Sequence, residues 1–99
     1  MRSVVESFYL DITTELSVLD HIVQELQKRV SGFCPGDGTV SMLMQRLRDL
    51  LQRGWQELQE LKRLSEENNR EGGHLIESVT NILRKLEEVI QSFERIFQC

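Results

Sequence analysis

Residues 75–97 carry apolar side chains at alternating steps of three and four, which is the period of one helix face. No polar residue interrupts this face, and it is wide enough to need covering by other helices. Its members are Leu75, Ile76, Val79, Ile82, Leu83, Leu86, Val89, Ile90, Phe93, Ile96 and Phe97. The pattern predicts a long amphipathic helix that packs against partners of the same kind.

The same period is present over residues 5–30. Residues 3–6 read Ser-Val-Val-Glu. This is a capping box, in which the serine hydroxyl and the glutamate carboxylate satisfy backbone N–H groups at the start of a helix. Gly32 stands where a left-handed C-cap would end that helix. We therefore expect a first helix over about residues 3–31.

A second apolar stripe covers residues 43–64, and Gly54 occupies one of its positions. A glycine inside a helix costs roughly 1 kcal/mol relative to alanine, so we expect either a close approach or a bend at Gly54. The sequence SEENNREGG that follows is polar throughout, which predicts fraying over residues 65–70. The second helix is expected over about residues 40–68.

Two adjacent glycines, Gly72 and Gly73, separate the second stripe from the third, and we expect the third helix over about residues 73–98. Short connections favour antiparallel neighbours. The expected fold is one all-α domain over residues 1–99, an antiparallel up-down-up three-helix bundle with long, coiled-coil-like helices. An alternative stays open at this point: the later helices could form a long helical hairpin or rod that dimerises as a coiled coil.

The chain of 99 residues has a net charge of −4. Phosphate binding depends on clustered Lys and Arg, so nucleic acid is not an expected partner. No apolar run approaches the roughly 18 residues of a membrane span. Acidic and polar residues also interrupt the N-terminal apolar stretch, unlike those of a signal peptide. We therefore expect a cytoplasmic or nuclear location and no membrane partner.

The sequence holds no residue pattern typical of catalysis or ligand binding. The segment GFCPGDG lacks the lysine and the following Ser or Thr of a phosphate-binding loop, and no metal-binding spacing of Cys or His is present. His21 and His74 are expected far apart in the bundle. The adjacent glutamates at 66–67 and 87–88 lie off the apolar stripes, whereas acid–base catalysis needs a desolvated carboxyl group. We expect no enzymatic activity, cofactor or metal.

Five aromatic or aliphatic residues are candidates for contact with a partner. Phe93, Ile96 and Phe97 near the C-terminus, together with Phe33 in the loop after the first helix, are expected to gather at one pole of the bundle. An exposed apolar patch of this kind is typical of a binding site. Trp55 flanks the second stripe, where it either closes the edge of the core or anchors a partner.

The two cysteines are expected at the same end of the bundle. Cys34 lies in the loop after the first helix, and Cys99 follows the third helix. A disulfide is conceivable if their Cα atoms come within about 7 Å. The other interpretation is a pair of reduced thiols in a reducing compartment.

These observations favour a non-enzymatic protein–protein interaction module, such as an adaptor, assembly or regulatory subunit that binds partner helices. Self-association is a further expectation, because three amphipathic helices bury only a thin core. Two alternatives stay open. One is an amphipathic protein that associates with lipid, and the other is a secreted helical ligand stapled by Cys34 and Cys99.

Overall fold

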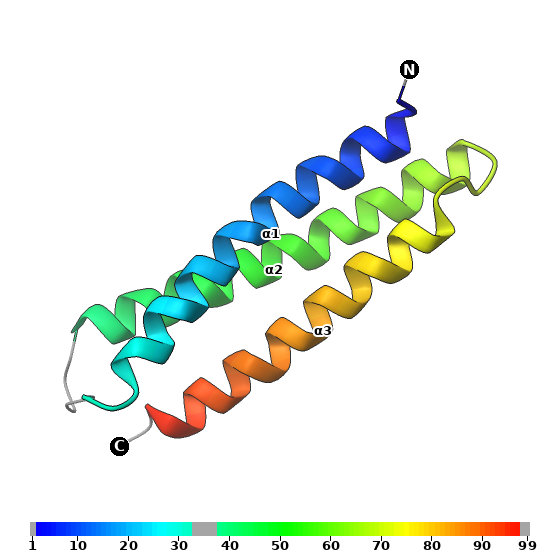
Figure 1. Cartoon of the computed structure of the whole chain (residues 1–99). Helices are drawn as coiled ribbons and strands as arrows, with labels where there is room; N and C mark the ends of the chain where they lie inside the picture. The colour runs from blue at the N-terminus through cyan, green and yellow to red at the C-terminus, as the bar shows by residue number, and fades with distance from the viewer. Residues whose placement is uncertain (1, 33–37, 98–99) are drawn as a thin grey trace.

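The chain folds back on itself twice, so that three helices lie side by side (Figure 1). The computed structural model describes residues 2–32 and 38–97. It contains α1 (Val4–Arg29), α2 (Gly38–Glu67) and α3 (Gly73–Ile96). α1 and α3 run in one direction and α2 runs in the other, in a molecule of 51 × 21 × 16 Å. This is the expected up-down-up three-helix bundle, and the turn after α2 excludes a continuous rod of α2 and α3.

The two ends of α1 differ in how well the sequence predicts them. At the start, the Glu6 N–H donates to the Ser3 hydroxyl at 3.1 Å, as the capping box predicts. At the other end the cap is Val30, with right-handed φ −59° and ψ −44°. The expected left-handed cap at Gly32 is wrong. A tighter last turn is formed instead, in which the Val30 N–H donates to the Gln27 carbonyl at 3.4 Å.

One apolar core runs the length of the bundle, and all three sequence stripes contribute to it. Burying one such side chain stabilises the fold by roughly 1.5–3 kcal/mol. The core residues are Val5, Ile12, Leu16, Leu19, Ile22, Leu26, Val40, Met44, Leu47, Leu51, Leu58, Leu61, Val79, Leu83, Leu86, Ile90 and Phe93.

Gly54 marks the place where α1 and α3 both press against α2. A Cβ atom at this position would lie 2.8 Å from Cδ2 of Leu83 and 3.4 Å from Cδ2 of Leu16. The first distance is shorter than van der Waals contact, so a larger residue would displace Leu83. The glycine in the second stripe is therefore explained by close approach.

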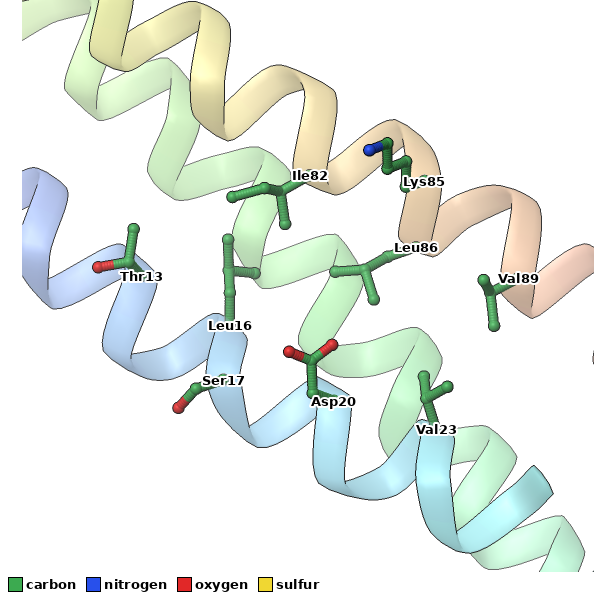
Figure 2. Close-up of a pocket in the computed structure, with 9 residues that line it drawn as sticks. All are labelled: Thr13, Leu16, Ser17, Asp20, Val23, Ile82, Lys85, Leu86 and Val89. Carbon is green, nitrogen blue, oxygen red and sulfur yellow. The ribbon is translucent and has the colours of Figure 1, made fainter. Parts of the chain in front are cut away.

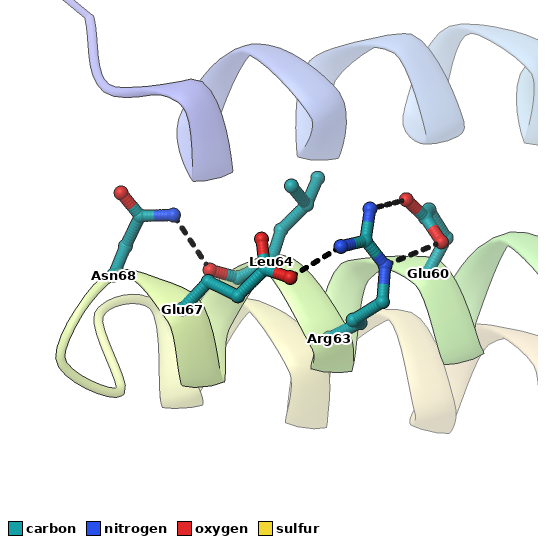
Figure 3. A network of polar contacts seen from close by, with 5 residues as sticks. All are labelled: Glu60, Arg63, Leu64, Glu67 and Asn68. Carbon is teal, nitrogen blue, oxygen red and sulfur yellow. Dashed lines mark hydrogen bonds and ion pairs between the residues drawn. The ribbon is translucent and has the colours of Figure 1, made fainter.

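The end of α2 is held by hydrogen bonds, and the expected fraying there is wrong. The Ser65 side chain is buried, and its hydroxyl donates to the Glu71 carbonyl at 2.5 Å. The Arg70 N–H donates to the Ser65 carbonyl at 2.7 Å. The Asn68 side-chain amide donates to the Leu64 carbonyl at 2.7 Å (Figure 3). Polar residues here satisfy the free carbonyl groups at a helix end, so their polarity does not indicate disorder.

Gly72 begins α3 in the left-handed conformation, with φ +81°. A Cβ atom on Gly72 would lie 2.6 Å from Cγ1 of Val5. The first turn of α1 therefore packs directly over the turn between α2 and α3. Glycine is required here by both the positive φ and the lack of space.

Candidate functional site

A groove lies between α1 and α3, where the bundle is least tightly closed. α1 packs more extensively on α2 than on α3. The α1–α3 groove has a volume of about 380 Å³ (Figure 2). Its apolar lining consists of Leu16, Val23, Ile82, Leu86 and Val89. Its polar rim consists of Thr13, Ser17, Asp20 and Lys85.

The apolar lining follows from heptad spacing on two parallel helices. Leu16 and Val23 are seven residues apart on α1, and Ile82 and Val89 are seven apart on α3, so each pair shares one side of its helix. Leu16 lies across the groove from Ile82, and Val23 lies across from Val89 (Figure 2). Val23, Ile82 and Val89 are only half-buried, because no further helix of this chain covers them.

The apolar strip continues beyond the groove towards the C-terminal pole of α1 and α3. Val30 follows Val23 by one heptad and is 36% exposed. Ile96 follows Val89 by one heptad and is 46% exposed. The groove is therefore part of a longer apolar strip.

A second groove, between α1 and α2, has a volume of about 410 Å³ but the opposite chemistry. Its lining is mostly charged: Phe8, Asp11, Glu15, Arg53, Gln56, Glu57 and Glu60. Arg53 bridges the two helices, with one guanidinium nitrogen 3.7 Å from Oε1 of Glu15 and Nε 3.3 Å from Oε1 of Glu57. We call this surface the acidic groove.

Glu57 is the most perturbed carboxyl group of the acidic groove. Burial, together with the hydrogen bond and negative charge of Glu15, raises the pKa of Glu57 to about 7, against the opposing effect of Arg53. The ion pairs of Arg53 with Glu15 and Glu57 account for the geometry of this cluster.

Sequence analysis missed the pairing of Glu15 with Glu57, although a signal was present. Glu15 stands seven residues after Phe8 and seven before Ile22, and both of these residues belong to the core or pack against it. Glu57 stands seven residues after Leu50 and seven before Leu64, in the same relation to α2. A polar residue at such a position on each of two antiparallel helices predicts a polar layer between them.

The seam between α2 and α3 is also crossed by an ion pair. A guanidinium nitrogen of Arg48 lies 3.4 Å from Oε1 of Glu94. Among residues 2–32 and 38–97, no ion pair within 4 Å crosses from α1 to α3. Asp20 and Lys85 face the α1–α3 groove from opposite sides without reaching each other (Figure 2).

Another polar network lies entirely on the outer surface of α2. Arg63 pairs with Glu60 and with Glu67, at spacings of three and four residues (Figure 3). Arg63 holds the pKa of Glu60 below its usual range. Such pairs on one helix stabilise it slightly, and their exposure leaves no enclosed space for a ligand.

The predicted contact residues near the C-terminus are divided between core and surface. Phe93 is 4% exposed and belongs to the core. Phe97 is half-buried, with its ring 5.8 Å from that of Phe93. Ile96 is exposed at the end of the apolar strip. Trp55 is half-buried and packs against the core, which matches the first of its two interpretations.

Three of the predicted site residues, Phe33, Cys34 and Cys99, lie outside the described residues. The contribution of Phe33 to the predicted pole patch and the predicted disulfide therefore fall outside the described residues. His21 and His74 are both exposed, on different helices. Within the described ranges, no cluster of His, Cys, Asp and Glu is arranged to hold a metal ion.

Comparisons with protein-family models, curated proteins and solved structures found no match for this chain. In the part of the chain that the structure describes, no helix is both long and apolar enough to cross a bilayer.

Proposed function

We propose that this protein is a non-enzymatic protein–protein interaction module that binds a partner helix in the α1–α3 groove. The observation that carries the proposal is the half-buried apolar lining of this groove, which no ion pair between described residues closes. An adaptor, assembly or regulatory subunit would use such a surface to hold another chain. Apolar strips of this kind on a protein surface are typical of interaction sites.

A helix laid in the groove would complete a four-helix arrangement with α1 and α3 as its walls. Its anchors would recur at i, i+3, i+4 and i+7, the pattern of helix-in-groove recognition. The rim residues Thr13 and Ser17 are small, so they allow a helix to approach closely. Each Å² of apolar surface removed from water contributes roughly 25 cal/mol before the cost of association.

The experiment is a selection of binders from a displayed library of amphipathic helical peptides. We expect the selected peptides to carry the i, i+3, i+4, i+7 pattern and to lose at least roughly tenfold in affinity for Val89→Lys. Val89 is half-buried in the groove, and a lysine there can extend its charged end to water while obstructing the floor.

The matched control is Met42→Lys, which also replaces an apolar residue by lysine. Met42 is 65% exposed on α2, and it does not line the groove. The control should keep the affinity of the original chain. Selected peptides that bind Val89→Lys as tightly as the original chain would contradict the proposed function.

A further inference from the structure

We propose that the occupant of the α1–α3 groove is a second copy of this chain, related by a two-fold axis parallel to the helices. This inference rests on the proposed function, because it names the partner of the same groove. In such a dimer, α1 of each copy lies against α3 of the other. Four helices then enclose the two apolar strips.

The charged residues on the rim of the groove favour a second copy of this chain as the partner. Asp20 lies four residues after Leu16, Lys85 lies three residues after Ile82, and Leu16 lies across from Ile82 (Figure 2). Asp20 and Lys85 are therefore at nearly the same height on opposite rims. A two-fold rotation parallel to the helices keeps this height and exchanges the rims. Asp20 of each copy then meets Lys85 of the other, and two opposite-charge pairs form.

The rim positions on either side of the charged pair are compatible with the same arrangement. One heptad away on α1 stand Thr13 and Gln27, and one heptad away on α3 stand Ser78 and Ser92. The rotation sets Thr13 level with Ser78 of the second copy, and Gln27 level with its Ser92. These hydroxyl and amide groups can donate to and accept from one another, and no like charges oppose each other there.

The direction of the axis follows from the same charges. An axis perpendicular to the helices would set α1 against α1 and α3 against α3. The α1 rim of one copy would then face the α1 rim of the other, and the two α3 rims would likewise face each other. Asp20 and Lys85 would therefore gain no partner of opposite charge. A closed two-fold interface uses one surface patch on both subunits, and this patch is self-complementary only for the parallel axis.

The exposed end of the apolar strip is covered in the same dimer. The parallel arrangement also brings Val30 of one copy level with Ile96 of the other. It therefore covers two of the exposed apolar side chains at the end of the strip.

The test uses sedimentation equilibrium of the full chain and of two charge-reversal variants, D20K and K85D. Each variant alone places two like-charge pairs in the interface, so we expect its dimer to dissociate at a concentration at least about tenfold higher. An equimolar mixture of D20K and K85D re-creates two opposite-charge pairs. We expect this mixture to form heterodimers with nearly the affinity of the original chain. Both positions are exposed, and thermal unfolding followed by circular dichroism checks that each variant folds.

The mixture separates a second copy from an unrelated partner, because only a self-complementary interface is rescued by two defective copies of the same chain. A chain that stays monomeric up to roughly 1 mM, or a dimer indifferent to both reversals, would overturn the inference. Failure of the proposed function is separately visible in the peptide selection. Peptides that bind the groove of a monomeric chain would leave that function standing while removing the second copy.

Discussion

α1 borders two grooves of nearly equal volume, about 410 Å³ on the side of α2 and about 380 Å³ on the side of α3. The acidic groove is crossed by Arg53, which pairs with Glu15 and with Glu57. The α1–α3 groove is lined mainly by aliphatic side chains, and its two rim charges do not reach each other. The two grooves therefore have similar volumes, but they differ in whether their side chains already have partners within the chain.

The difference shows that volume alone does not identify a binding site. In the acidic groove, Arg53 already pairs with Glu15 and Glu57, so a ligand there would have to displace these contacts at a cost in desolvation. Aliphatic side chains in the α1–α3 groove gain free energy from any surface that removes them from water. The α1–α3 groove is therefore the better candidate for docking, and four experiments sharpen this comparison.

The largest expected effect is a loss of stability, which should be greater for a core residue than for a residue of the groove lining. Leu83 is fully buried against Gly54, and its neighbour Ile82 is half-buried in the groove. We expect Leu83→Ala to lower the free energy of unfolding by roughly 2–5 kcal/mol, and Ile82→Ala to lower it by about 1 kcal/mol, because part of that side chain stays hydrated. Urea denaturation of dilute protein measures both. Equal losses in the free energy of unfolding would mean that Ile82 is fully buried between α1 and α3 in solution.

A smaller loss is expected at Gly54 of α2, against which Leu16 and Leu83 pack. Gly54→Val inserts side-chain atoms between α2 and Leu83, where the space is shorter than a normal contact. Overpacking of this kind costs about 1–3 kcal/mol. Gly73→Val serves as the control, because no atom lies within 4 Å of a Cβ at Gly73. Thermal unfolding of both variants gives the comparison, and a Gly54→Val variant as stable as the original chain would show that the helices separate easily.

The acidic groove should make stability depend on pH. Folding raises the pKa of Glu57 from 4.5 to about 7, so the folded state holds a proton that the unfolded state releases. The stabilisation from this proton is fully present below pH 4.5 and is lost as the pH rises through 7.

Glu57→Gln should remove this dependence, and it should be more stable than the original chain at pH 8 by on the order of 1 kcal/mol. The exposed Glu88 gives the control Glu88→Gln, for which no such change is expected. Chemical denaturation between pH 4 and pH 8 gives the slopes. Parallel curves for Glu57→Gln and the original chain would contradict the assignment.

The smallest expected effect concerns the ion pair between α2 and α3. Arg48 and Glu94 are both substantially exposed, so Arg48→Gln should cost only about 0–1 kcal/mol, and added salt should shrink the difference. Denaturation at low and high ionic strength measures this. A loss well above that range, unchanged by salt, would mean that ion pairs rather than apolar contacts hold this seam.

Helical periodicity alone predicted the three helices and their order, because an apolar stripe must be buried and Gly72 breaks the chain between the last two. The close approach at Gly54 was one of two expectations, and only the positions of Leu16 and Leu83 decided between them. The C-terminal cap of α1 depends on the conformation of a single backbone turn. A glycine two residues after Val30 does not determine that conformation.

The grooves were harder to predict, since both depend on which helix each stripe faces. Val23 and Val89 belong to stripes that the sequence predicts to be covered by other helices, yet they are half-buried where α1 and α3 meet. Glu15 and Glu57 come from parts of the chain that only the antiparallel pairing of α1 and α2 brings together. Periodicity identifies the face of a helix, but not the seam in which each residue lies.

An odd number of helices has a geometric consequence, because it leaves the start of α1 and the end of α3 at opposite poles (Figure 1). Anything joined before α1 and after α3 is held apart by a rod 51 Å long. A bundle of two or four such helices would bring both attachments back to one pole. The bundle therefore sets the separation of two such attachments by the length of its helices.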